Sequence, residues 1–278
     1  AKLGKRLAKE AGNRLRVRAC ERLSEAVDGA DFAISSIGGS GPSLGGVYGT
    51  AAHSADLMIP AKYGIFQLVG DTGGPAGMMM GLRSIPIYLS ICKEMEKRCP
   101  EVVVLNHSNP MAVLCRAMLK YSGIRKVIGI CHGVQGGIMQ TAELLGVEPE
   151  ELEVVWIGTN HYYWFTRVRL HGKDVYPEVM AKMRRRKPPH GEIMASELSE
   201  MYGYRLVYLE DGHELEFYPF LAQAGDPMNL PYGYGEKAGP RYQNLNLKTP
   251  RLTRAEQAKA RAEGLKEFAE RLSHRGLP

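Results

Sequence analysis

Hydrophobic and polar positions predict strands and helices in turn along residues 31–146. Short apolar runs of strand length lie at Asp31–Ser36, Glu101–Leu105 and Lys126–Cys131. Longer stretches follow them, with apolar positions at helical spacing. These predicted helices cover Met79–Arg98, Met111–Tyr121 and Gly136–Leu145. The alternation is typical of an α/β fold, with a doubly wound, Rossmann-like domain built on a parallel sheet.

The residues before this pattern predict a helix at 3–11, a short strand at 14–19 and a second helix at 21–27. A dinucleotide-binding domain normally opens with a strand and a glycine-rich turn that binds the pyrophosphate. No such turn precedes Ala30, and the nearest glycine cluster, residues 38–41, follows a later strand. We therefore expect the sequence to be part of a longer protein, without the first strand of this domain.

The pattern changes near residue 150. Leu152–Gly158 and Phe165–Leu170 predict two strands joined around a polar centre, Asn160-His161. A helix follows Glu192, and a charged helix is predicted at 253–271. We place a Rossmann-like dinucleotide-binding domain at residues 1–150. Residues 151–278 are then an α+β domain for substrate binding and dimerisation, incomplete at its C-terminal end.

Composition and charge exclude some classes of protein. The 278 residues are 44% hydrophobic and 24% charged, as in ordinary soluble domains, and no apolar run is long enough for a membrane span. Five cysteines without framework spacing favour a reducing cytoplasm. The net charge of +6 suits an anionic cofactor or nucleic acid. The basic run at 184–187 has no interleaved aromatic residues, so we expect a solvated loop and no nucleic-acid or membrane partner.

Two candidate sites follow predicted strands. Asn106-His107-Ser108-Asn109-Pro110 follows one strand, and Cys131-His132-Gly133 ends the next. Ligands of open α/β sheets bind at the carboxyl ends of the strands. An Asn there can contact a ribose or substrate hydroxyl, or simply form a turn before the helix. A Cys there can be a metal ligand or a buried small residue.

Three further segments carry candidate chemistry. The imidazole of His161 and the thiolate of Cys131 can share one divalent ion, although lone histidines are more often structural. The cluster Glu210–Glu216 can supply a general acid or base, or form a solvated turn. The glycine loop Val69–Gly77 allows close approach of backbone to a ligand, but such loops are common.

Six motifs, taken together in their order, resemble glycoside hydrolase family 4, the NAD- and metal-dependent α-glucosidases, α-galactosidases and their phospho-sugar relatives. The resemblance extends from about Asp31 to Leu221, which is most of the chain. The motifs are IPAKYGIFQLVGDTGGPAG, GLRSIPIYLSICKEMEKRCP, LNHSNPMAV, IGICHGVQG, IGTNHYYW and EDGHELEFYPFL.

The resemblance implies roles for the matching positions. Cys131 and His161 match the ligands of a divalent metal, Mn²⁺ or another ion. His132 and Asp211 match catalytic positions, where His132 replaces an Asp of other members. Asn109 matches the residue between nicotinamide and sugar. The other matching positions are expected to face NAD (Ser36, Ile37, Gly38, Asp71 and Asn106, with Asn109) or the sugar (Asn160, with Asn109).

The implied mechanism is a redox cycle. NAD takes a hydride from C3 of the sugar, and the resulting ketone acidifies the proton at C2. The metal stabilises the enolate as a Lewis acid while a base removes that proton, and the glycosidic bond then breaks. Water adds and the hydride returns. NAD-dependent members of this family are exceptions to the rule of two catalytic carboxylates.

The sequence departs from the family pattern at four places. The opening glycine-rich turn is absent, and Gly38 stands where an Arg is often found. Residues 39–55 match poorly, and the family's C-terminal third is absent after about Arg271. We expect a partial sequence, because the strand Asp31–Ser36 would otherwise expose a long apolar edge.

Two other interpretations stay open at this point. A lactate- or malate-type dehydrogenase shares a strand-end Asn-Pro and a downstream His, but has no need of a thiolate beside its substrate. A binding or scaffold protein without activity is the other alternative. Within the family, the motifs VGDTGGP and CHGVQG favour free α-glucosides, α-galactosides or α-uronides over 6-phospho-sugars. The family also implies a homodimer or homotetramer.

Overall fold

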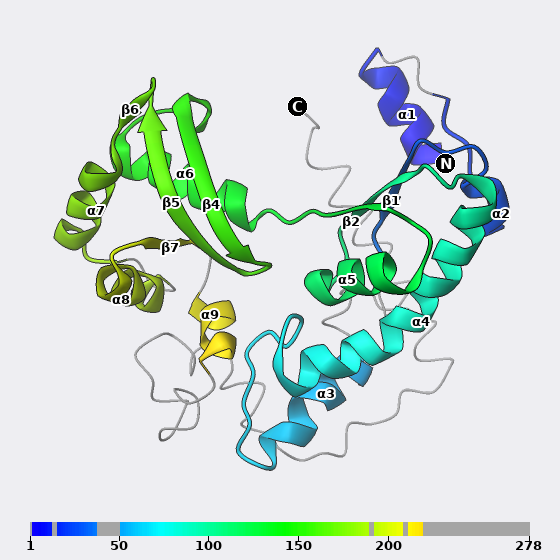
Figure 1. Cartoon of the computed structure of the whole chain (residues 1–278), viewed down its shortest axis with the longest axis horizontal. Helices are drawn as coiled ribbons and strands as arrows, with labels where there is room; N and C mark the ends of the chain where they lie inside the picture. Colours follow the sequence, from blue (N-terminus) through cyan, green and yellow to red (C-terminus); the bar gives the residue numbers. More distant parts are fainter. Residues whose placement is uncertain (1, 13–15, 38–50, 189–191, 208–210, 219–278) are drawn as a thin grey trace.

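The structure is a computed structural model that describes residues 2–12, 16–37, 51–188, 192–207 and 211–218 (Figure 1). Several predictions lie outside these residues. They concern the cofactor contact at Gly38 and the charged helix at 253–271.

A parallel sheet of three strands forms one half of the structure. Its strands are β1 (Phe32–Ser35), β2 (Val103–Asn106) and β3 (Lys126–Gly129), in the order β1-β2-β3. Ser35, Asn106 and Gly129 stand in register at the carboxyl ends of the strands. The prediction of a Rossmann-like α/β domain with a parallel sheet is thus confirmed.

Two helices, α4 (Gly74–Arg98) and α5 (Met111–Tyr121), pack together on this sheet. Their buried side chains form one core with the strands, which includes Tyr88, Leu114 and Val104. Helix α4 begins five residues earlier than expected, because Gly73 and Pro75 form its N-terminus. Pro86 therefore lies in the interior of the helix, away from its first turns.

An antiparallel sheet forms the other half of the structure. Strand β5 (Tyr162–Leu170) pairs with β4 (Leu152–Thr159), β6 (Lys173–Asp174) and β7 (Arg205–Val207). The strands expected around Asn160-His161 are confirmed. Helices α6 (Gly133–Leu145), α7 (Tyr176–Arg185) and α8 (Ile193–Tyr202) accompany this sheet (Figure 1). The core of this half joins α6 to the sheet through Ala142, so α6 packs with the second half.

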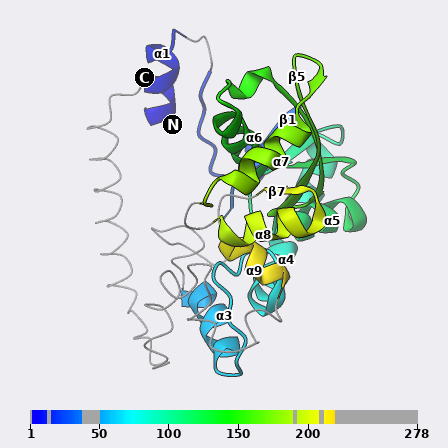
Figure 2. The same cartoon turned by 90° about the vertical axis from the view of Figure 1, so that its left-hand side faces the viewer.

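Four further α-helices lie before β1, between β1 and α4, or after β7. They are α1 (Lys2–Glu10), α2 (Leu23–Ala26), α3 (Ala51–Ala61) and α9 (Asp211–Phe217). Helix α9 packs against α8 and β5, while α3 packs against α4 (Figure 2). The short strand expected at 14–19 was wrong for the described residues 16–19, which form neither helix nor strand. The segment Glu210–Glu216 is helical over its described part, which excludes a solvated turn there.

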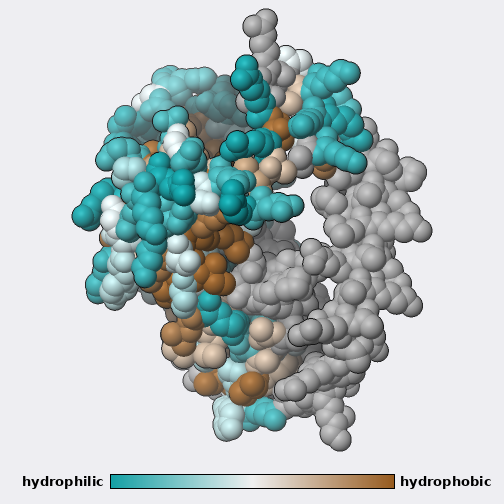
Figure 3. Space-filling view, turned by 90° about the vertical axis from the view of Figure 1, so that its right-hand side faces the viewer, coloured by the Kyte–Doolittle hydropathy of each residue, from teal (hydrophilic) through white to brown (hydrophobic). Residues whose placement is uncertain are grey.

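The surface along α4 changes from hydrophobic near its beginning to charged near its end. Hydrophilic side chains cover the upper part of the face in Figure 3, and hydrophobic ones gather in its middle and lower part. The last turns of α4 are charged, whereas Met78, Met79 and Leu82 near its beginning are exposed. None of the described helices has the length and apolar character that crossing a membrane would require.

Candidate active site

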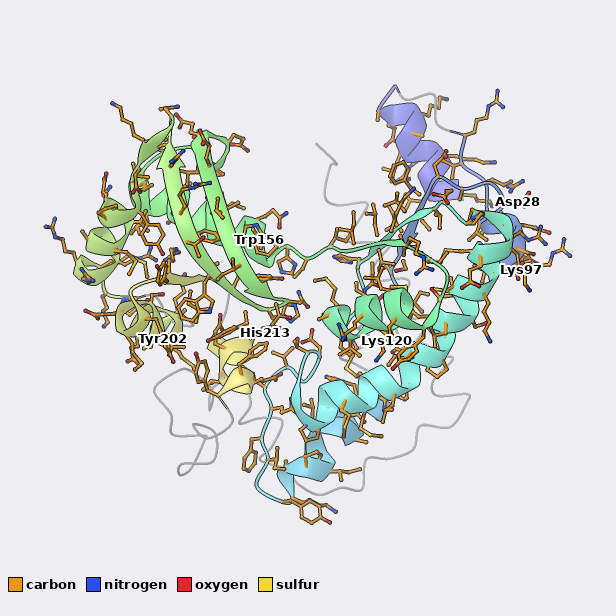
Figure 4. The ribbon with its side chains drawn as sticks, viewed as in Figure 1. Asp28, Lys97, Lys120, Trp156, Tyr202 and His213 are labelled. Carbon is orange, nitrogen blue, oxygen red and sulfur yellow. The ribbon has the colours of Figure 1, made fainter. Side chains whose placement is uncertain are left out.

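Three segments from distant parts of the chain meet between the two halves. Figure 4 shows His213 on α9, below the tip of the β4–β5 hairpin and facing the loop that precedes α4. That loop carries Asp71, and the tip of the hairpin carries His161. The Nε2 atom of His213 lies 3.6 Å from Oδ1 of Asp71. The meeting point is therefore lined by ionisable side chains from all three segments.

The loop before α4 is folded tightly around Asp71, whose side chain is fully buried. Gly70 adopts a φ of +70°, and a Cβ there would lie 2.6 Å from Leu57. A Cβ on Gly77 would lie 2.7 Å from the backbone of Thr72. Glycine is therefore required at both positions for steric reasons, in addition to the backbone freedom that the sequence suggested.

Buried polar side chains hold this loop in place. Oε1 of Glu216 accepts hydrogen bonds from the backbone N–H groups of Val69 and Gly70, both at 2.7 Å. Gln67 accepts from the N–H of Ala76 at 2.9 Å. Burial raises the pKa of Glu216 to about 7, although the two backbone hydrogen bonds act in the opposite direction. Glu216 therefore fixes the backbone immediately before Asp71.

The β4–β5 hairpin presents His161 through a turn of two residues, Asn160 and His161. His161 has a φ of +67°, which is uncommon for a residue other than glycine. A Cβ on Gly158 would lie 2.1 Å from the carbonyl oxygen of Tyr162, so only glycine fits there. Such backbone outliers persist where the surroundings determine them, often at functional sites.

Cys131 and His161 interact directly, with the His161 side chain buried and Cys131 half-buried. Burial alone would raise the pKa of the Cys131 thiol, but hydrogen bonds with His161, the Gly133 backbone and Asn160, together with the charge of His161, outweigh burial and lower the pKa below its usual value. Burial likewise opposes the charge on His161, yet Asp71 and Cys131 raise its pKa to about 9. The arrangement thus favours a thiolate, which is the nucleophilic and metal-binding form of cysteine.

Asp71 stands at the centre of the cluster. Its Oδ1 accepts a hydrogen bond from Thr72 at 2.8 Å, and its Oδ2 accepts one from Nδ2 of Asn109 at 2.6 Å. Nδ1 of His161 lies 2.5 Å from the Thr72 hydroxyl and 3.5 Å from Oδ1 of Asp71. Ligand atoms of Asp71, His161 and His213 all lie within 4.8 Å of one another. This part of the site could therefore hold a metal ion.

The two strand-end asparagines differ in their surroundings. Asn109 reaches the cluster through its hydrogen bond to Asp71, and its predicted place between nicotinamide and sugar stays a prediction. Asn106 is fully buried, and its amide bonds to Ser35, Tyr88 and Ser108. These partners occupy both ends of the amide. Its contacts suit a residue that fixes the ends of β1 and β2, and the predicted NAD contact stays a prediction.

Other predicted site residues lie apart from the cluster or cannot be placed. His132 precedes α6 and lines a cavity of about 580 Å³ along that helix. Ser36 is exposed after β1, whereas the N–H of Ile37 donates to Ser108 Oγ at 2.7 Å. Asp211 begins α9, but its side chain lies outside the described part of the structure. The catalytic roles of His132 and Asp211 stay predictions.

Sequence reasoning assigned no role to Thr72, His213 or Glu216 individually. His213 and Glu216 lie one helical turn apart on α9, and the cluster Glu210–Glu216 was noted only as a possible acid or base. The available signal was a His three residues before a Glu in a segment that also carries Leu215, which is buried. Their proximity to the loop before α4 depends on contacts across about 140 residues, which no local pattern reveals.

Comparison with known proteins decides the family. A sequence model described as "Family 4 glycosyl hydrolase" matches residues 1–147, which is more than half of the chain. The chain belongs to glycoside hydrolase family 4. The family assignment confirms the resemblance and does not favour the alternative of a lactate- or malate-type dehydrogenase.

Individual relatives match parts of their length. An alpha-galactosidase of Bacillus subtilis is 36% identical over 173 residues, which cover 62% of this chain and 40% of the relative. An alpha-galacturonidase of Thermoanaerobacterium saccharolyticum is 34% identical, with coverage of 57% and 34%. The chain thus spans less than half the length of these relatives.

A solved structure supports the fold. The crystal structure of a 6-phospho-alpha-glucosidase from gut microorganisms, in complex with NAD and Mn²⁺, superposes with a TM-score of 0.67. It is 21% identical in sequence, and the match covers 97% of this chain and 58% of that one. At this level of identity the likeness bears on the fold alone.

Proposed function

We propose that this chain provides the catalytic centre of an NAD- and divalent-metal-dependent glycosidase that cleaves α-galactosides or α-uronides. The observation that carries the proposal is the hydrogen-bonded pair of half-buried Cys131 and buried His161, with Asp71 beside it. A thiolate and an imidazole placed together in this way are also suited to share one divalent ion.

The donor set fits a catalytic metal. Cys131 and His161 would hold the ion, and positions not taken by protein atoms would remain for oxygens of the sugar. Oδ1 of Asn160 is buried beside them and has no hydrogen-bond partner among the described residues. Its Nδ2 donates to the Tyr163 hydroxyl at 2.9 Å, so the amide is held with the oxygen available. A sugar hydroxyl could satisfy this acceptor.

The carboxyl ends of β1 and β2 provide the expected place for the cofactor. Ser36 is exposed there and would contact NAD, while Asn106 keeps the two strand ends aligned. When bound, NAD and the divalent ion would supply hydride transfer at C3 and Lewis-acid polarisation of the sugar oxygens. Asn109, fixed by Asp71, would place the sugar between them.

The choice of sugar rests on the relatives. The two relatives described above are an alpha-galactosidase and an alpha-galacturonidase, and both act on sugars without a 6-phosphate in their printed names. The motifs around Asp71 and Cys131 favour the same branch. We therefore place α-galactosides and α-galacturonides ahead of α-glucosides and phospho-sugars as substrates.

Hydrolysis of p-nitrophenyl α-galactoside, α-galacturonide and α-glucoside tests this function, with and without NAD and Mn²⁺. We expect activity on one of the first two, which requires both additions, and a loss of at least about 100-fold in Cys131→Ser, because removal of a metal ligand disables metal catalysis. Cys20→Ser, distant in sequence and on a partly exposed residue, is the control and should retain activity. Activity that is independent of NAD, or unchanged in Cys131→Ser, would exclude the proposed function.

A further inference from the structure

We propose that Tyr163 is a positioning residue for the sugar. Its hydroxyl holds the amide of Asn160 in the one orientation in which Oδ1 can accept a hydrogen bond from a sugar hydroxyl. The inference rests on the proposed function, because the ligand is the sugar of that reaction. It assigns a role to a tyrosine to which the motif pattern gave none.

The amide of Asn160 spends its hydrogens within the protein. Nδ2 donates to the Tyr163 hydroxyl at 2.9 Å, and the Asn160 side chain also hydrogen-bonds to Cys131. The Tyr163 hydroxyl in turn hydrogen-bonds to Cys131. Because its surroundings favour a thiolate, the sulfur accepts from both neighbours. The three side chains thus form a closed network, and Oδ1 of Asn160 has no partner among the described residues.

This network determines which way the amide faces. The two ends of an Asn amide have nearly the same shape, so hydrogen-bond partners decide its orientation. Half a turn would bring Oδ1 against the Cys131 thiolate, where two acceptors face each other without a hydrogen between them. The single hydrogen of the Tyr163 hydroxyl can satisfy only one of the two. Removal of that hydroxyl takes away an acceptor for Nδ2 and weakens the preference for the observed orientation.

The ring of Tyr163 is held in place by packing. Only 4% of the residue is exposed, and it belongs to the core that joins α6 to the antiparallel sheet. Its ring meets that of Trp156 edge to face, with centroids 5.4 Å apart, and Trp156 lies on β4 (Figure 4). The hydroxyl therefore has a fixed place, and Tyr163→Phe removes it while the ring keeps its packing.

The free oxygen of Asn160 defines what the site accepts at this position. Asn160 is 3% exposed, and a buried acceptor without a donor costs free energy. A hydroxyl group of a bound sugar supplies the missing donor, whereas a deoxygenated carbon cannot. The site should therefore discriminate against sugars that lack this one hydroxyl, and Tyr163 acts on that discrimination through Asn160.

Calorimetric binding of the product sugars, D-galactose and D-galacturonate, tests this inference without net turnover in protein that holds NAD and Mn²⁺. For the sugar that binds, Tyr163→Phe should raise the Kd roughly 3- to 10-fold, the loss of about one hydrogen bond. Asn160→Ala should raise it at least as much, and the double variant no more than Asn160→Ala alone, because Tyr163 acts through Asn160. Among monodeoxy derivatives of that sugar, one should lose affinity for the wild-type protein but not for Asn160→Ala.

Tyr176→Phe is the matched control. The Tyr176 hydroxyl also bridges two partners, the carbonyl oxygen of Phe165 at 2.6 Å and the backbone N–H of Arg205 at 2.7 Å, and both lie outside the candidate site. Thermal unfolding of each variant establishes that it is folded. Where a product sugar binds too weakly for calorimetry, the KM of the p-nitrophenyl substrate gives the same comparison.

The outcomes separate this inference from the proposed function. If Tyr163→Phe binds the sugar as tightly as Tyr176→Phe, the positioning role is wrong and the proposed function stands. The same holds if the losses from Tyr163→Phe and Asn160→Ala add up in the double variant, because Tyr163 would then act independently of Asn160. If the wild-type protein binds neither sugar and hydrolyses none of the p-nitrophenyl substrates, the proposed function fails, and the inference fails with it.

Discussion

Glu216 shows how one buried carboxylate can position a site that it does not enter. It accepts two backbone hydrogen bonds just before Asp71, and it lies one helical turn after His213 on α9. The same side chain therefore links the loop that carries Asp71 to the helix that carries His213. Burial of its charge is costly, and this cost raises its pKa to about 7.

Stability should depend on pH through this residue. The folded protein holds the Glu216 proton up to about pH 7, whereas the unfolded chain releases it near 4.5. The stability contributed by this proton is fully present below pH 4.5 and is lost as the pH rises through 7. The free energy of unfolding of wild type relative to Glu216→Gln should therefore fall between these values, by up to about 1.4 kcal/mol per pH unit.

Urea unfolding of both proteins at several pH values between 4 and 8.5 measures this difference. Glu178→Gln is the control, because Glu178 is exposed on α7 and pairs with Lys182 one turn later. The free energy of unfolding of wild type relative to Glu178→Gln should change little with pH. If the free energy of unfolding of wild type relative to Glu216→Gln is constant across the range, or rises with pH, the burial argument is wrong.

At the scale of elements, the tip of the β4–β5 hairpin determines where His161 stands. Gly158 has a φ of +139°, and a Cβ there would overlap the carbonyl oxygen of Tyr162 at 2.1 Å. Gly158→Ala should therefore displace the turn and destabilise the protein by at least about 1–3 kcal/mol, the cost of a strained backbone position. It should also weaken Mn²⁺ binding, since the turn carries a proposed metal ligand.

Gly172→Ala separates the effect of an unfavourable φ from the effect of steric overlap in Gly158→Ala. Gly172 lies at the other end of β5, has a φ of +77°, and has open space where a Cβ would stand. Its substitution brings the unfavourable φ without the overlap, and it is remote from His161. Thermal unfolding and Mn²⁺ affinity of both variants give the comparison. Equal losses in both would show that steric overlap at Gly158 does not control the hairpin.

Elements with strong local patterns could be predicted from sequence, and elements defined by distant partners could not. The helix Met111–Tyr121 was predicted with its observed bounds, and the turn at Asn160-His161 was located correctly. Helices α3 and α7 and strand β7 were missed. Strand β7 has three residues, all buried, and pairs with β5. It is therefore defined by a tertiary contact that the local sequence does not reveal.

The same distinction applies to the candidate site. Cys131 and Asn109 follow strands whose carboxyl ends meet at one edge, so their neighbourhood could be inferred from the α/β pattern. The pairing of Cys131 with His161 required the family resemblance. Neither the α/β pattern nor the family resemblance predicted the place of His213, because it depends on how α9 packs against α8 and β5. Packing of this kind leaves no periodic signal in a helix of seven residues.

At the scale of the whole molecule, the proposed metal centre joins the parallel and antiparallel halves. Cys131 follows the parallel sheet, His161 belongs to the antiparallel sheet, and α9 approaches both from below (Figure 4). A ligand that binds only the folded state stabilises it in proportion to its occupancy, by about 2.7 kcal/mol at 100 times its Kd. Ion binding should therefore increase the stability of the two halves together.

Mn²⁺ at 100 times its Kd should raise the thermal midpoint by roughly 5–10 °C, since about 1 kcal/mol corresponds to 2–4 °C in a protein of this size. Differential scanning calorimetry with and without Mn²⁺ measures the shift, and excess EDTA should reverse it. Cys131→Ser should show little or no shift at the same concentration, whereas Cys20→Ser should behave as wild type. A shift that persists undiminished in Cys131→Ser would mean that the ion binds elsewhere. A midpoint unaffected by Mn²⁺ in the wild-type protein would mean that no such link between the halves forms.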